Sequence, residues 1–326
     1  MAKANRLLPF ILSKTIEYIS FIHYNKHVGN NEKGVCTMNE IIAEYNRIIF
    51  EKMSRFINFE ADYIRPEFIK SLCEDYGLSK EEAYSIALAG AVDLDTDDPE
   101  DEEIYEYYFP RMVHMLERKA FSSDPYLKNI RIPDVTLDKW ELCHKKYAPY
   151  QAFVFDDPKL MRDGRIIPQI GFFDKEFSYP AVLENGVEWM LITPNEINTM
   201  RSPIERARGN VLTYGLGLGY FAYMASQKRN VKSVTVIERD KSVISLFNEI
   251  ILPQFPHKEK INIIKASAYS FAEKLNEQSG YDFVFADIWH DPTDGIKAYK
   301  RLKKTEKLLP DAEFAYWIEK TLMLYL

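Results

Sequence analysis

The sequence of 326 residues has no apolar run that approaches the roughly 20 residues of a membrane-spanning helix. It also has no excess of positive charge, because 42 Lys and Arg stand against 49 Asp and Glu, and the formal net charge is -7. A general nucleic-acid-binding protein usually carries a basic face, so this balance argues against nucleic acid as a partner. The three cysteines, Cys36, Cys73 and Cys143, form no Cys-x-x-Cys pair. We therefore expect free thiols, a cytoplasmic protein without a membrane partner, and no metal site.

The length favours more than one domain, and the first part of the chain has a helical pattern. Ser79, with Glu82 three residues later, has the spacing of a capping box at a helix start. No strand pattern interrupts this region, so we predict a helical N-terminal domain over residues 1–148. Its helices are expected at 7–22, 38–57, 66–76, 79–90 and 104–118.

An acidic segment, DLDTDDPEDEE, lies between Asp93 and Glu103. Its first aspartates have the alternate spacing of an EF-hand calcium loop, but the pattern fails further on. Asp98 stands where that loop needs glycine, and Ile104 stands where it needs a bidentate glutamate. We interpret the segment as a solvated loop.

Residues 149–194 are predicted to form a small antiparallel β subdomain. Asp163-Gly164 separates two short runs, and Asn185-Gly186 separates SYPAVLE from VEWMLIT. Asn-Gly between extended runs indicates a hairpin, because both turn positions need a positive φ.

Residues 195–326 alternate between strand and helix patterns, which is typical of a parallel sheet with helices on both faces. The fold class is therefore α/β, with a Rossmann-like sheet in the strand order 3-2-1-4-5. The chain ends soon after the fifth strand, and an uncovered sheet edge would favour a homodimer. The expected strands are 211–214, 231–238, 261–266, 281–287 and 313–318, and the expected helices are 196–207, 219–228, 241–252, 271–277 and 295–308.

A glycine loop, VLTYGLGLGYFA over residues 211–222, follows the first of these strands. In a parallel sheet, ligands bind beyond the carboxyl ends of the strands, where the strand order reverses. Glu238 ends the next strand and can accept hydrogen bonds from two ribose hydroxyls, so the combination predicts a ligand that contains adenosine. Gly217-x-Gly219-x-x-Ala222 fits a dinucleotide fingerprint, whereas Gly215-x-Gly217-x-Gly219 fits the first motif of S-adenosylmethionine-dependent methyltransferases.

Residues 209–292 resemble the S-adenosylmethionine-dependent methyltransferase superfamily, which has a Rossmann-like fold, and within it the spermidine (polyamine) synthase-like branch. The resemblance lies in VLTYGLGLG, VKSVTVIERD, KSVISLFNEIILP and YDFVFADIWHDP. It implies S-adenosyl-L-methionine as cofactor and Asp287 at the reacting centre. The other cofactor-binding positions that it implies are Gly215, Gly217, Gly219, Glu238, Arg239, Ser267 and Ala268.

The chain departs from these relatives where they place acids. Thr213, Leu218 and Ser267 stand at those positions, two of which serve the amino group of the ligand or its adenine. An acid would then have to come from elsewhere, and Glu188 and Glu196 are the candidates.

The candidate catalytic residues are Asp287, His290 and Asp291, because a carboxylate or an imidazole near a sulfonium can stabilise charge or take a proton. A cap for the following helix is the alternative role of Asp291. We predict an S-adenosylmethionine-dependent methyltransferase that acts on a small molecule. The alternatives are aminopropyl transfer, an NAD-dependent oxidoreductase, and a non-enzymatic protein with a degenerate cofactor site.

Overall fold

The computed structural model describes residues 38–326, so the helix expected at 7–22 and Cys36 lie outside the described residues. The chain divides into two compact units. Unit 1 contains the described residues up to Arg118, together with Lys146–Phe177 and Met323–Leu326, and unit 2 contains Lys119–Lys145 and Ser178–Leu322. The two compact units divide the chain at other positions than 148 and 194. The domain boundaries at 148 and 194 stay a prediction.

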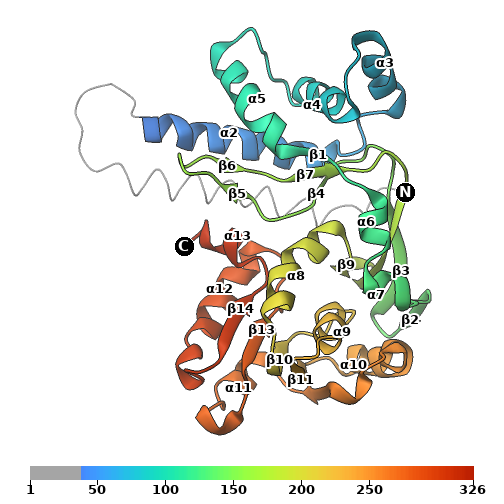
Figure 1. Ribbon diagram of the computed structural model, residues 1–326, viewed down its shortest axis with the longest axis vertical. Coiled ribbons are helices and arrows are strands. Elements are labelled where there is room, and N and C mark those ends of the chain that lie inside the picture. The colour runs from blue at the N-terminus through green and yellow to red at the C-terminus, as the bar shows by residue number, and fades with distance from the viewer. Residues whose placement is uncertain (1–37) are drawn as a thin grey trace. The chain divides into compact units, whose positions relative to one another are not determined.

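Four helices form most of unit 1: α2 (Met38–Phe59), α3 (Pro66–Tyr76), α4 (Lys80–Ala91) and α5 (Pro99–Met112) (Figure 1). The predictions for α2, α3 and α4 are confirmed. The capping box is present, since the Ser79 hydroxyl accepts the Glu82 N–H at 3.2 Å and the Glu82 carboxylate accepts the Ser79 N–H at 2.8 Å. These reciprocal bonds satisfy two backbone donors that the first turn leaves open.

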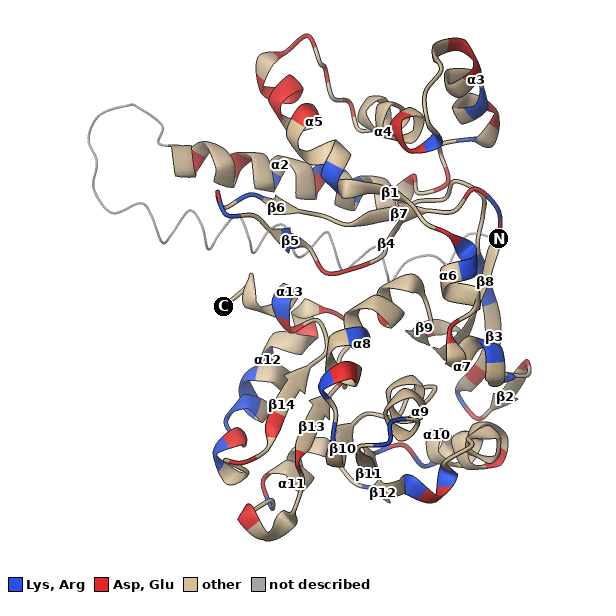
Figure 2. Ribbon diagram, in the orientation of Figure 1, with Lys and Arg blue, Asp and Glu red and all other residues tan. Residues whose placement is uncertain are grey.

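Helix α5 begins earlier than predicted, at Pro99 rather than at Ile104. The Asp98 carboxylate accepts the N–H groups of Glu100 and Asp101, and Pro99 suits the first helical position. Figure 2 shows the acidic start of this helix, where negative charge interacts favourably with the helix dipole.

Three strands correct the prediction that residues 1–148 are purely helical: β1 (Val113–Met115), β2 (Val135–Leu137) and β3 (Trp140–Tyr147). β1 pairs in parallel with β7 (Ile170–Phe172), and its partner lies far along the chain. A three-residue strand with a distant partner has too little local periodicity for a sequence pattern to reveal it.

The remaining strands of unit 1 are short: β4 (Phe153–Val154), β5 (Lys159–Leu160) and β6 (Ile166–Ile167). β5 and β6 pair across Asp163-Gly164, which confirms that turn. The core includes buried Tyr84, whose ring stacks on Phe172 with centroids 4.0 Å apart. Buried Asn46 holds the hairpin, because its side chain binds the Gly164 carbonyl and the Ile166 N–H.

Unit 2 contains most of an antiparallel sheet in the order β2-β3-β8-β9, with β8 at Phe177–Glu184 and β9 at Val187–Leu191. The hairpin at Asn185-Gly186 is confirmed, with φ values of 51° and 78° at the two turn residues. Two short helices, α6 (Arg118–Ser122) and α7 (Pro125–Asn129), lie between β1 and β2 along the chain.

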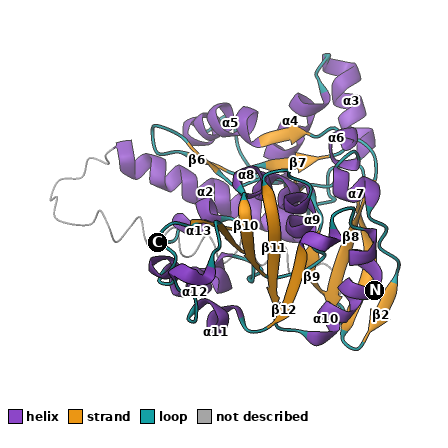
Figure 3. Ribbon diagram, turned by 60° about the horizontal axis from the view of Figure 1, so that its bottom comes forward, coloured by secondary structure: helices purple, strands orange, loops and turns teal. Residues whose placement is uncertain are grey.

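The main sheet of unit 2 is parallel and has five strands in the order β12-β11-β10-β13-β14, which confirms both the predicted order and the α/β, Rossmann-like fold class. Figure 3 shows β10, β11 and β12 of this sheet. The strand order reverses at β10, so the ends of β10 and β13 face the crevice between the two halves of the sheet. The strands are β10 (Gly209–Tyr214), β11 (Val231–Glu238), β12 (Ile261–Lys265), β13 (Phe283–Ala286) and β14 (Glu313–Tyr316).

Helices alternate with these strands, and several of them differ from the prediction. The helix expected over 295–308 ends at Lys303, and Glu319–Met323 forms a helix that was not predicted. The helix expected over 241–252 ends as an α-helix at Leu246 and continues as a π-helical turn over Phe247–Ile251. The helix expected over 271–277 lies at Ala268–Ala272. The helices of this part are α8 (Pro194–Arg206), α9 (Tyr220–Ser226), α10 (Lys241–Leu246), α11 (Ala268–Ala272), α12 (Pro292–Lys303) and α13 (Glu319–Met323).

Candidate functional site

The glycine loop connects β10 to α9, and all three of its glycines have left-handed backbone, with φ of 95° at Gly215, 49° at Gly217 and 75° at Gly219. Other residue types rarely adopt this conformation. The loop also packs closely, since a Cβ atom on Gly215 would lie 1.9 Å from the Asp287 carbonyl oxygen. The glycines are therefore required both by backbone geometry and by close packing.

Side chains of unit 2 lie against the other two glycines. A Cβ on Gly217 would lie 1.8 Å from the Met190 sulfur, and one on Gly219 would lie 2.3 Å from the Phe247 ring. Phe247 begins the π-helical turn after α10. Such turns occur frequently at functional sites, and here the turn brings an aromatic ring against the loop.

The backbone N–H and the backbone carbonyl of Leu218 both form hydrogen bonds with side chains. The Leu218 N–H donates to the Met190 sulfur at 3.1 Å, and the Leu218 carbonyl accepts the Tyr126 hydroxyl at 2.5 Å. Tyr126 in α7 is fully buried. Sequence reasoning missed both Met190 and Tyr126, because neither belongs to a motif and both lie far from the loop along the chain.

Glu238 ends β11 and points toward the same loop. Its carboxylate accepts the Leu216 N–H at 3.3 Å and the Asp240 N–H at 2.8 Å. The side chain is half-buried. A carboxylate has about four acceptor positions, so Glu238 retains acceptor capacity for further donors.

The predicted adenine-side residues lie at the neighbouring strand end. Glu238 stands opposite Lys265, the last residue of β12, and Ser267 and Ala268 follow two and three residues later. Ser267 and Arg239 are exposed, whereas Ala268 is half-buried. These residues therefore share the carboxyl edge of the sheet with the glycine loop.

Asp287 follows β13, and its N–H donates to the Tyr214 carbonyl at 2.9 Å. Glu196, in the first turn of α8, lies near enough for the two carboxylates to interact. Burial raises the pKa of Asp287 to about 7, while nearby His290 lowers it. Burial and the charge of Asp287 raise the pKa of Glu196 well above its usual range. Paired carboxylates with raised pKa values are typical of functional sites.

His290 lies beside this acid pair. Its Nδ1 lies 3.0 Å from a carboxylate oxygen of Asp294, which orients the ring. The Trp189 ring packs edge-on against it, with centroids 4.0 Å apart. Asp291 instead caps α12, because its carboxylate accepts the Thr293 N–H at 2.6 Å. The structure thus gives Asp291 a helix-capping contact, and a catalytic role for it stays a prediction.

Thr213 and Leu218, which stand where the sequence resemblance led us to expect acids, are both buried neutral side chains. Of the two replacement candidates, Glu188 forms an ion pair with Lys145 at 2.9 Å. Glu196 interacts instead with another acid, because the charge that acts on it is the carboxylate of Asp287. Glu196 is therefore the added acid that the structure brings to the predicted reacting centre.

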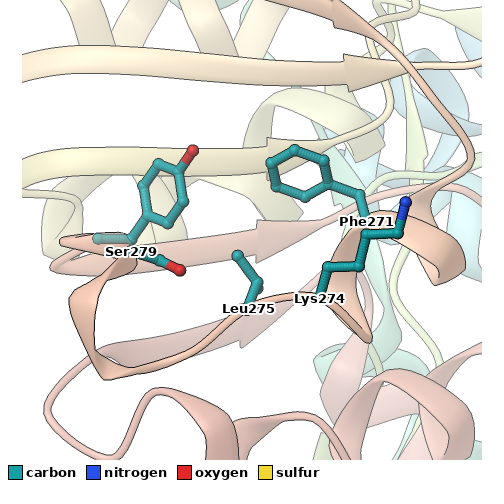
Figure 4. Close-up of a pocket in the computed structure, with 5 residues that line it drawn as sticks. Phe271, Lys274, Leu275 and Ser279 are labelled. Carbon is teal, nitrogen blue, oxygen red and sulfur yellow. The ribbon is translucent and has the colours of Figure 1, made fainter.

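A cavity of about 260 Å³ lies elsewhere in unit 2 and is lined by Phe271, Lys274, Leu275, Ser279 and Tyr281 (Figure 4). Helix α11 starts at the carboxyl edge of the sheet and runs toward the amino ends of the strands. Tyr281 precedes Phe283, the first residue of β13. The cavity therefore lies toward the amino ends of the strands, away from the glycine loop. Within residues 38–326, no cluster of three or more His, Cys, Asp and Glu side chains suits a metal ion.

No protein-family model matches the chain, and no curated protein matches it. Among solved structures, it is similar to spermidine synthase from Thermotoga maritima, with 15% identity and a TM-score of 0.33 over 45% of this chain and 54% of that one. A spermidine synthase in complex with the transition-state analogue AdoDATO gives 14% identity and a TM-score of 0.33 over 45% and 53%. The match thus spans about half the length of these synthases, and the fold assignment rests on the strand order of the chain itself. None of the helices within residues 38–326 combines the length and apolar character needed to cross a membrane.

Proposed function

We propose that unit 2 binds S-adenosylmethionine at the carboxyl edge of its parallel sheet and transfers the methyl group to a small molecule. The observation that carries this proposal is the pair of half-buried acids Glu196 and Asp287, which interact with each other next to the glycine loop, where the strand order reverses. Two carboxylates in one partly buried place favour a cation, and the donor is a sulfonium.

The residues at the sheet edge suit the adenosine part of this ligand. Glu238 retains acceptor capacity for two ribose hydroxyls while it anchors two backbone N–H groups. Ser267 and Ala268, at the end of β12, would face the adenine edge, and exposed Arg239 would lie beside the ring.

Bound S-adenosylmethionine supplies a methyl group on a cationic sulfur. The chain's task is to hold the acceptor in line, to balance the positive charge and to take the acceptor's proton. Asp287, with a pKa of about 7, can accept that proton near neutral pH. His290, oriented by Asp294, is the next group along the loop.

A second candidate function is aminopropyl transfer from decarboxylated S-adenosylmethionine to a diamine. The same pair of acids supports it, because two carboxylates match an acceptor that carries more than one ammonium group. The neutral side chain of Leu218, where relatives place an acid, counts against it.

Product analysis on the full chain tests both functions. One reaction contains S-adenosylmethionine with a panel of small amines, phenols and thiols, and the other contains decarboxylated S-adenosylmethionine with putrescine. S-adenosylhomocysteine in the first supports methyl transfer, whereas 5′-methylthioadenosine in the second supports aminopropyl transfer. Asp287→Asn should lower turnover by roughly a hundredfold or more, and Asp311→Asn, a change at an exposed acid, should not. Equal turnover in both variants would refute the assigned role of Asp287.

A further inference from the structure

The three glycines of the loop differ in what lies against them. Gly215 meets a backbone carbonyl, that of Asp287, and Gly219 meets the ring of Phe247, which is only 1% exposed. Neither group can move without disturbing the core. Gly217 meets the end of the half-buried Met190 side chain, and a methionine side chain is unbranched with three rotatable bonds. Of these three positions, a ligand can therefore most readily reach the loop at Gly217.

Met190 also covers the next amide along the loop. The Leu218 N–H donates to the Met190 sulfur at 3.1 Å, and the Tyr126 hydroxyl holds the Leu218 carbonyl. A thioether is a weak acceptor, so the site holds a fixed donor whose present partner is readily replaced. Met190 itself lies near the end of β9, next to a register shift between Val182 and Leu183 in the β8–β9 pair.

The position of Met190 relative to Glu238 has a consequence for ligand choice. Glu238 marks the ribose position, and its contact with the Leu216 N–H places the ribose beside the start of the loop. The 5′ substituent of an adenosine ligand would then extend along Gly217 and Leu218, which Met190 covers. The cover that Met190 provides therefore disfavours a large 5′ substituent.

We propose that Met190 is a specificity-determining residue, which lowers the affinity of the site for S-adenosylmethionine relative to adenosine ligands with a small 5′ substituent. This inference rests on the proposed function, since it assumes that the site takes adenosine ligands. The Met190 side chain must rotate away before the methionine part of the donor can reach the loop, whereas the adenosine part binds without that rotation. If only a fraction of the molecules has the Met190 side chain rotated away, the apparent affinity is the intrinsic affinity multiplied by that fraction.

Titration calorimetry of the full chain tests the proposal with three ligands: S-adenosylmethionine, 5′-methylthioadenosine and adenosine. The wild type should bind 5′-methylthioadenosine more tightly than S-adenosylmethionine. Met190→Ala should improve the affinity for S-adenosylmethionine by about tenfold and leave adenosine within about twofold. Met190→Leu keeps the volume of the side chain and should resemble the wild type. Met323→Ala truncates an exposed methionine in α13 and serves as the control.

The outcomes separate the inference from the proposed function. If all ligands bind but Met190→Ala leaves their relative affinities unchanged, Met190 has no role in specificity and the proposed function stands. If neither the wild type nor Met190→Ala binds any of the three ligands, both proposals are refuted. If Met190→Ala does not fold, Met190→Val replaces it in the same titrations, because valine is shorter than methionine and is favoured in strands.

Discussion

Replacing Asp287 with asparagine should make unit 2 more stable at neutral and alkaline pH. Burial raises the pKa of Asp287 to about 7, from 3.8 for an ordinary aspartate. Between these two values the unfolded chain releases the proton while the folded chain retains it. Stability therefore falls as the pH rises through this window and levels off above about pH 7. Asparagine carries no such proton, so the variant lacks this loss.

The magnitude follows from the width of the window. Each pKa unit corresponds to about 1.4 kcal/mol, so the two units between about pH 5 and pH 7 give at most about 3 kcal/mol. Asp287 is half-buried, and solvent screening reduces this value, so we expect about 1–3 kcal/mol. In a unit of this size, such a change raises the melting temperature by roughly 2–10 °C.

Tryptophan fluorescence isolates unit 2 in this experiment, because Trp140, Trp189, Trp289 and Trp317 are the four tryptophans of the chain and all lie in that unit. Thermal unfolding is followed at several values between about pH 5 and pH 8 for the wild type and for Asp287→Asn. Asp311→Asn, at an exposed position, is the matched control.

The expected result is a difference in melting temperature between Asp287→Asn and the wild type that grows with pH. A difference that stays constant with pH, or a wild type that is the more stable protein at about pH 8, would refute the raised pKa assigned to Asp287. A pH-dependent gain of the same size in Asp311→Asn would show that the effect is not specific to the acid pair.

Three further predictions follow from other contacts. Glu238→Gln retains one acceptor oxygen, so its free energy of unfolding should lie within about 1 kcal/mol of the wild-type value. It should bind adenosine ligands at least tenfold more weakly in a calorimetric titration. An unchanged affinity would show that Glu238 does not contact the ligand. Gly219→Ala should destabilise unit 2 by about 1–3 kcal/mol in urea unfolding, because its backbone is left-handed and its Cβ would meet the buried ring of Phe247. Gly77→Ala, where φ is also positive but no atom lies within 4 Å, should cost about 1 kcal/mol, and equal costs would contradict the packing argument. Asn46→Ala should destabilise unit 1 by about 2–4 kcal/mol in scanning calorimetry, since it leaves buried partners without hydrogen bonds.

The parallel sheet was predictable from the sequence because its signals are local. Each strand is a short apolar run followed by a helical pattern, and the glycine loop marks the first turn. The order of the strands then follows from general rules of chain connection. The hairpin at Asn185-Gly186 was predictable for the same reason, since two residues determine the turn.

The features that sequence reasoning missed depend on distant partners. β1 forms a strand because β7 lies beside it, and the π-helical turn at Phe247 accompanies close packing against Gly219. Met190 and Tyr126 bind Leu218 from positions 28 and 92 residues away. The sequence did suggest Glu196 as a replacement acid, but its proximity to Asp287 became visible only in the structure.

The central claim is that the carboxyl edge of the parallel sheet is an adenosine site, and calorimetric titrations of the full chain with adenosine and with S-adenosylmethionine test it most directly. We predict saturable binding at one site per chain, weakened at least tenfold in Glu238→Gln and unchanged in Asp311→Asn. The absence of heat with both ligands at millimolar concentration, or equal binding by the wild type and Glu238→Gln, would contradict the claim.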